Sequence, residues 1–175
     1  MSYAIVFSSK TGNTKLLAET IYKNLKQENC CYFGTPDLAA MEADTLYVGF
    51  WTDKGTADSA TVDFLKQMHG KKVFLFGTAG FGGSEEYFAK ILKTVKKSLD
   101  DSNTIIGSFM CQGKMPLSVR CRYENMKKQP THAMPNLDAL IENFDKALSH
   151  PDAEDLEHLK QAIKQAIKQA EKWFT

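Results

Sequence analysis

The stretch Ser8-Ser9-Lys10-Thr11-Gly12-Asn13-Thr14 lies between an apolar run, residues 3–7, and a helical pattern of apolar residues, 14–25. At the start of a helix the backbone N–H groups have no partner within the helix, and the helix dipole favours negative charge there. The serine and threonine hydroxyls add donors without adding charge, and Gly12 lets the backbone approach a ligand closely. The stretch therefore predicts a strand, a phosphate-binding loop and a helix, in this order.

The rest of the chain repeats the alternation of strand and helix. Apolar runs predict further strands at 30–33, 45–50, 72–76 and 104–110, and helical spacing predicts helices at 58–68, 84–99, 136–148 and 152–174. The residues between 110 and 135 are predicted to form a long irregular stretch. This alternation predicts an α/β three-layer sandwich around a five-stranded parallel sheet.

The 175 residues favour one domain, 1–150, followed by a C-terminal amphipathic helix, 151–175, that packs on the domain or pairs with another chain. No apolar run approaches the ~18 residues of a membrane span, and no export signal is evident, so we expect a cytoplasmic protein. The four cysteines match no zinc-binding spacing, and we expect no metal site. Cys111 is interpreted as a buried structural thiol rather than a redox thiol.

Net charge is only +1, but the charges are unevenly distributed. Residues 111–130 contain five cations and one carboxylate: Lys114, Arg120, Arg122, Lys127, Lys128 and Glu124. This basic stretch has three interpretations: a solvated surface loop, a lid over a ligand, or a docking face for an acidic partner or substrate.

Two further loops are expected to share an edge of the sheet with the phosphate loop, because ligands of such sheets bind outside the carboxyl ends of the strands. The loop after the third strand, 51–56, contains Trp51, and the glycine-rich loop after the fourth strand, 77–83, contains Phe81. Two aromatic side chains beside one crevice can sandwich a flat ring, and glycines bring backbone groups close to its edge. The three loops together predict a phosphorylated ligand with a planar ring system.

The pattern Ser9-x-Thr11-Gly12-Asn13-Thr14 resembles the phosphate-loop signature of flavodoxins, and the Trp51 and Phe81 loops stand where flavodoxins keep their ring-contacting loops. The resemblance covers about residues 1–150 and implies the strand order 2-1-3-4-5 with FMN at the point where the order reverses. It implies that the phosphate is held by one set of residues and the ring by another. The phosphate set is Ser9, Lys10, Thr11, Gly12, Asn13 and Thr14; the ring set is Trp51, Thr52, Asp53, Gly55, Thr78, Ala79, Gly80, Phe81 and Gly82.

A narrower resemblance, carried by the segments 50–55 and 111–115, is to single-domain flavodoxin-like proteins of anaerobic bacteria, one of which accompanies bilirubin reductase. It implies an FMN protein that shuttles electrons from a reductase to a partner enzyme and needs no catalytic side chain. The alternative is an FMN-dependent reductase acting directly on a quinone, a nitroaromatic or a tetrapyrrole such as bilirubin. The C-terminal helix leaves a homo-oligomer open.

The sequence also differs from the flavodoxin pattern. Many flavodoxins are strongly acidic, whereas this chain is near neutral and carries Lys54 beside Trp51. A cation near the ring stabilises the reduced anion, so we expect a milder reductant than a low-potential flavodoxin. Other phosphate-binding classes lack their signatures here: the acidic residues of a receiver, the Cys-x5-Arg loop of a cysteine phosphatase, the G-x-G-x-x-G dinucleotide fingerprint and the Gly-Lys-Ser/Thr of a P-loop.

Overall fold

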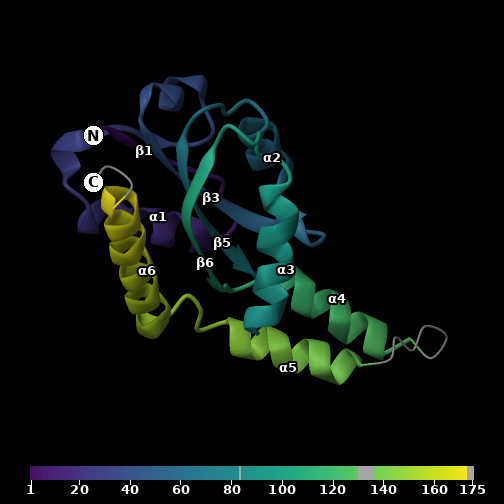
Figure 1. Cartoon of the computed structure of the whole chain (residues 1–175). Coiled ribbons are helices and arrows are strands. Elements are labelled where there is room, and N and C mark those ends of the chain that lie inside the picture. The colour runs from purple at the N-terminus through teal and green to yellow at the C-terminus, as the bar shows by residue number, and fades with distance from the viewer. Residues whose placement is uncertain (83, 130–135, 173–175) are drawn as a thin grey trace.

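The computed structural model describes residues 1–82, 84–129 and 136–172, and it shows strands and helices alternating along the chain (Figure 1). The strands are β1 (Tyr3–Phe7), β2 (Cys30–Gly34), β3 (Thr45–Asp53), β4 (Thr56–Ala57), β5 (Lys72–Ala79) and β6 (Thr104–Gln112). The helices are α1 (Asn13–Asn24), α2 (Ser59–Leu65), α3 (Glu85–Lys96), α4 (Leu117–Lys127), α5 (Leu137–Ala147) and α6 (Ala153–Lys172). None of the described helices is long and apolar enough to cross a membrane.

The main sheet is parallel and has the order β2-β1-β3-β5-β6, which confirms the predicted order of five strands. A short sixth strand, β4, pairs antiparallel with the end of β3. In register, Phe7 of β1 pairs with Gly49 of β3, and Gly77 of β5 pairs with Phe50. The carboxyl ends of β1, β3, β5 and β6 therefore meet at one edge, where the predicted loops begin.

Two apolar cores cover the two faces of the sheet, which explains why β1 is a continuous apolar run. Ala4 and Val6 belong to the core that includes residues of α2 and α3, while Tyr3, Ile5 and Phe7 belong to the core that includes residues of α1 and α6. The C-terminal helix contributes its fully buried side chains to the second core, namely Leu159, Ile163 and Ala166. The helix expected at 152–174 thus packs on the sheet beside α1.

The predicted irregular stretch from 110 to 135 is wrong over most of its length. Strand β6 continues to Gln112, and residues 117–127 form α4; residues 130–135 lie outside the described part of the chain. Helix α4 has no fully buried residue; Val119, Tyr123 and Met126 stand at helical spacing but are only half-buried. This apolar stripe is only three residues long and lies among polar and charged residues, so periodicity gave a weak signal there.

The loops after the third and fourth predicted strands also begin later than expected. Trp51, Thr52 and Asp53 belong to β3, and Thr78 and Ala79 belong to β5. Strand β3 turns back into β4 through Lys54 and Gly55, whose φ angles are +49° and +82°. Positive φ at both central residues defines the tight hairpin turn that matches the twist of paired strands, and this hairpin extends the ladder beyond the expected end.

Candidate functional site

The loop between β1 and α1 has the geometry of an anion-binding helix start. Gly12 precedes α1 with a φ of +87° and provides no side-chain cap. The Ser9 hydroxyl accepts a hydrogen bond from the Lys15 N–H at 3.2 Å, while the Ser8 N–H donates to the Gly49 carbonyl at 3.0 Å. The loop is thus fixed to β3 at its start and closed across its end. The first N–H groups of α1 have no partner within the helix.

Two buried side chains at the start of α1, directly after this loop, face the protein rather than solvent. The Asn13 amide donates to the Thr11 hydroxyl at 2.8 Å and to the Lys114 carbonyl at 2.9 Å. The Thr14 hydroxyl lies 3.2 Å from the Phe50 carbonyl, to which it donates, and 3.2 Å from the Thr78 hydroxyl. These bonds join the loop to β3, β5 and the segment after β6, so both side chains position the loop.

The hairpin of β3 and β4 forms the second wall of the site. Trp51 is half-buried, and the Lys10 ammonium lies 5.0 Å from its ring centroid, a cation–π contact. The N–H of Asp58 donates to the Trp51 carbonyl at 3.1 Å, and the buried Asp58 carboxylate caps α2 through Thr61. The hairpin is therefore anchored at its base, and the Lys10 charge is held against the ring.

The loop after β5 forms the third wall and is held from two sides. The Gly80 carbonyl accepts hydrogen bonds from the Gln112 amide at 3.1 Å and from the Asn143 amide at 2.9 Å. Met115 covers Gly80 so closely that a Cβ on this glycine would lie 2.4 Å from the Met115 Cγ. Phe81 itself remains 38% exposed, as a side chain available to a ligand at the edge would be.

The sequence prediction missed Gln112, Lys114, Met115 and Asn143 as parts of the site. The first three fall within or beside the segment that carries the narrower resemblance, so that segment held the signal. Asn143 lies on α5, 63 residues from Gly80, and nothing in its local sequence indicates the bond. A cavity of about 230 Å³ also lies against the phosphate loop, and its lining includes Gly12, Asn13, Lys114 and His150.

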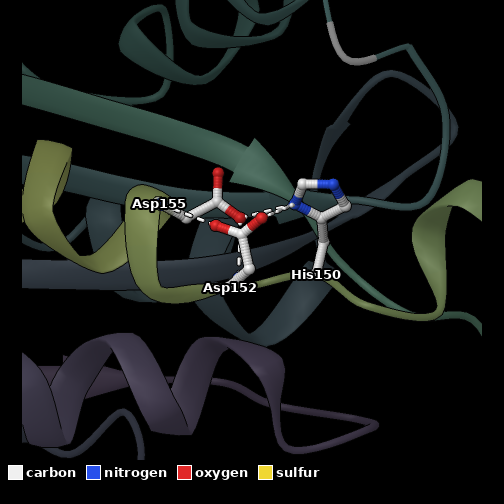
Figure 2. A group of neighbouring side chains, drawn as sticks. All are labelled: His150, Asp152 and Asp155. Atoms are coloured by element: carbon white, nitrogen blue, oxygen red, sulfur yellow. Dashed lines mark hydrogen bonds and ion pairs between the residues drawn. The ribbon is translucent and has the colours of Figure 1, made fainter.

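His150, Asp152 and Asp155 form a polar cluster next to the site (Figure 2). The Lys114 N–H donates to the His150 carbonyl at 2.9 Å, and the His150 Nδ1 lies 2.6 Å from the Asp155 carboxylate. Asp152 accepts from the Asp155 N–H, and Asp155 accepts in return from the Asp152 N–H, each at 2.9 Å. This reciprocal pair is a capping box, and the cluster accounts for the start of α6.

Cys111 lies in the core that α6 covers and is 3% exposed. Burial raises the pKa of its thiol well above the usual range, and the carboxylates of Asp155 and Asp152 add to the shift. A protonated, enclosed thiol of this kind fits the structural role expected for Cys111.

The parallel sheet with this strand order, and the three loops at its carboxyl edge, define a flavodoxin-type α/β protein. The flavodoxin domain family model matches residues 4–164, so the chain belongs to the flavodoxin family. It is 39% identical over 175 aligned residues to the flavodoxin-like domain-containing protein BilS of Clostridium symbiosum (strain WAL-14163), covering 89% of this chain and 90% of that protein. It is 31% identical over 165 residues to BilS of Clostridioides difficile (strain CD3), with the same coverage.

Solved flavodoxins share the fold at low sequence identity. The oxidised flavodoxin 2 from Bacillus cereus matches with a TM-score of 0.59 and 17% identity over 98% of this chain and 99% of that one. A Streptococcus flavodoxin matches with a TM-score of 0.57 and 19% identity over 98% of this chain and 99% of that one. At these identities the likeness supports the architecture only.

Proposed function

We propose that this protein binds FMN at the carboxyl edge of its sheet and carries electrons from a reductase to a partner enzyme. Its flavodoxin domain implies a redox function, and FMN when bound supplies reversible electron-transfer chemistry. The observation that carries the proposal is a pair of orphaned polar atoms. Among the described residues, three buried side-chain oxygens have no hydrogen-bond partner. The Tyr3 hydroxyl lies at the start of β1, away from the site, whereas Asn13 Oδ1 at the start of α1 and Thr52 Oγ1 near the end of β3 lie at the carboxyl edge of the sheet.

A buried polar atom without a partner costs free energy that a bound ligand can recover by supplying the missing hydrogen bond. Asn13 Oδ1 can only accept, whereas Thr52 Oγ1 can donate or accept, so the pair suits a ligand with both kinds of group. FMN has hydroxyl donors on its ribityl chain and acceptors on its ring and phosphate. The residues present therefore fit the cofactor that the family membership suggests.

In this proposal the phosphate lies against the hydroxyls of Ser9 and Thr11 and the N–H groups from Gly12 to Thr14, with Lys10 beside it. The side chains of Trp51 and Phe81 contact the flat ring. The remaining members of the predicted ring set meet its edges through backbone groups: Thr52, Asp53, Gly55, Thr78, Ala79, Gly80 and Gly82. Asn13 and Thr14 add positioning of the loop, as their contacts with Lys114 and Phe50 indicate.

Lys10 gives the proposed site a positive charge next to its ring wall. Its ammonium lies against Trp51, and Lys54 stands in the turn of the same hairpin. Positive charge near the ring favours the more negative, reduced cofactor, so we expect a higher reduction potential than in strongly acidic flavodoxins. A redox titration of the purified protein measures it, and a very low potential for the second electron would contradict this part of the proposal.

The cofactor is tested by the absorption spectrum of desalted protein and by titrating FMN into flavin-free protein in a calorimeter. The variant Thr11→Glu places a negative charge against the phosphate, and we expect it to weaken FMN binding by about 100-fold or more. Thr11→Gln has the same size without the charge and serves as the control, with a much smaller expected loss. Equal FMN affinity in both variants would contradict the placement of the phosphate.

Direct reduction of a small planar acceptor is the second candidate, favoured by the exposed Lys114 where the chain leaves β6 beside the site. A cation there can attract an acidic acceptor such as a propionate-bearing tetrapyrrole. Mixing the reduced protein with bilirubin or a quinone, without a partner protein, separates the two functions. Rapid reoxidation of the flavin supports the reductase, and persistence of the reduced flavin supports the carrier.

A further inference from the structure

Helices α4 and α5 form a hairpin that projects from the carboxyl edge of the sheet (Figure 1). Ion pairs hold the two helices together: Arg120 with Asp145, and Lys127 with Asp138. Arg120 also pairs with Glu124 at 3.0 Å within α4. One side of α4 is therefore committed to α5, and its charges are neutralised inside the hairpin.

The opposite side of α4 has a different composition. At 3.6 residues per turn, one face gathers six side chains, all of them exposed: Leu117, Ser118, Cys121, Arg122, Asn125 and Lys128, the last just beyond the helix end. This outward face of α4 has two cations, and the one carboxylate at its border, Glu124, pairs with Arg120 of the same helix. Within the described part of the chain, no ion pair joins Arg122, Lys128 or the neighbouring Lys114 to an acidic group.

The base of the hairpin is fixed to the proposed flavin site. The Lys114 carbonyl accepts from Asn13 of the phosphate loop, Met115 covers Gly80, and Asn143 of α5 donates to the Gly80 carbonyl. Leu117, 69% exposed, begins α4 two residues after Met115. The rise of 1.5 Å per residue places Lys128 about 16 Å further along the axis. A body seated on α4 thus touches the edge where the ring is expected.

We propose that the outward face of α4 is the docking surface for an acidic redox protein. This inference rests on the proposed function, because it assigns the surface through which the proposed electron transfer takes place. The face carries two cations that form no ion pair within the described structure, and an exposed leucine at its start, so it is complementary to a surface of carboxylates with an apolar side chain at one end. The serine and asparagine can hydrogen-bond a protein surface. A membrane-binding helix needs a broad apolar face, and Leu117 is the one large apolar side chain on this face.

The first test is the rate of electron transfer from the reduced, FMN-loaded protein to an acidic cytochrome, cytochrome b5, measured by stopped flow. The double variant Arg122→Glu and Lys128→Glu is compared with Lys164→Glu and Lys168→Glu. The latter changes net charge equally, at two exposed lysines of α6. We expect the α4 variant to be about tenfold slower and the α6 variant to change less than about twofold. Basic cytochrome c should not be slowed by the α4 variant.

The second test detects contact between α4 and cytochrome b5 and does not depend on the flavin. A photo-cross-linker on Cys121, in a Cys31→Ser background that removes the other exposed thiol, should capture cytochrome b5. The adduct should be lost in the Arg122→Glu, Lys128→Glu variant and at about 1 M salt, where the Debye length is about 3 Å.

Equal slowing by the α4 and α6 variants, or cross-linking to cytochrome c instead of cytochrome b5, would overturn the docking surface. Binding to phosphatidylglycerol vesicles that the α4 variant abolishes, with no effect on the cytochrome, would assign the face to a membrane and overturn it too. If the protein binds no flavin, the first test cannot show electron transfer and the proposed function fails. The cross-linking test does not need the flavin, so it still shows whether the outward face of α4 binds the acidic cytochrome.

Discussion

Helices α4 and α6 both follow β6 and both carry several cations, yet they have opposite relations to the sheet. Helix α6 buries Leu159, Ile163 and Ala166 in the core, whereas α4 has no fully buried residue. Helix α6 starts at a capping box, whereas α4 follows Pro116, which makes no side-chain cap. Helix α6 is thus part of the packed core that supports the site, whereas α4 lies on the surface and leaves one face open to a partner.

The difference has an energetic basis. A helix of 11 residues, the length of α4, is marginal in water, and most helices in proteins are stabilised by burying an apolar face. Helix α4 has no fully buried residue, so we expect it to depend on its contacts with α5, ion pairs among them, and on the bonds of the hairpin to the Gly80 loop. We therefore expect the two helices to differ in how well they shield nearby thiols from reagents, in how much a substitution changes the free energy of unfolding, and in how much they depend on their caps.

The largest expected difference is in the reactivity of two thiols. Cys121 is exposed on α4, whereas Cys111 lies in the core that α6 covers, where burial raises the pKa of its thiol. We expect N-ethylmaleimide to label Cys121 more than about 1,000-fold faster at pH 8, because labelling of Cys111 requires opening of the core. Mass spectrometry of timed digests measures both rates, with urea-unfolded protein as the control. Comparable labelling rates for the two thiols in the folded protein would mean that α6 does not shield Cys111 of β6 from the reagent.

The second difference is in the free energy of unfolding. Leu159→Ala removes a fully buried side chain from α6 and is expected to cost about 3 kcal/mol, within the usual range for buried leucines. Met126→Ala removes a partly buried side chain from α4 and is expected to cost less than about 1 kcal/mol. Urea titrations followed by circular dichroism give both values. A larger loss of unfolding free energy for Met126→Ala than for Leu159→Ala would mean that α4 contributes to the stability of the domain as much as α6 does.

The same contrast explains which features were predictable from the sequence. The phosphate loop and α6 were predicted because their signals are local: a hydroxyl-rich loop before a helix, and an apolar stripe at helical spacing. Helix α4 was missed because its apolar stripe is short, namely the half-buried Val119, Tyr123 and Met126, and lies among charged side chains. The bond from Asn143 to Gly80 joins residues far apart in sequence, so only the folded chain brings this part of the site together. The turn at Lys54 and Gly55 lengthened β3 because hairpin geometry overrode the expected loop.

The third prediction tests how the hairpin of α4 and α5 is attached to the loop after β5. Asn143→Ala removes two hydrogen bonds, the one that Asn143 donates to the Gly80 carbonyl and the one that its Oδ1 accepts from the Gln112 amide. The expected loss of stability is about 2 kcal/mol, at about 1 kcal/mol for each bond. FMN affinity should fall several-fold, because the Phe81 loop loses one of its supports. Calorimetry and urea titration measure the two effects, and Glu142→Ala, an exposed neighbour on α5, is the control. Unchanged FMN affinity would show that the hairpin does not support the ring loop.

The smallest expected effect concerns the cap of α6. The Asp155 N–H, which donates to the Asp152 carboxylate, lowers the pKa of Asp152 below its usual value. A carboxyl group whose pKa is lower in the folded state stabilises the protein above its unfolded pKa, about 3.9, and this contribution is lost as pH falls through the folded value. Asp152→Asn keeps a good capping residue but removes the charge. Thermal melts should therefore show the variant slightly less stable at pH 7, with the difference shrinking toward pH 3. A difference that stays constant over this range would mean that the cap acts through its hydrogen bonds alone, and that charge adds nothing to the advantage of α6 over α4.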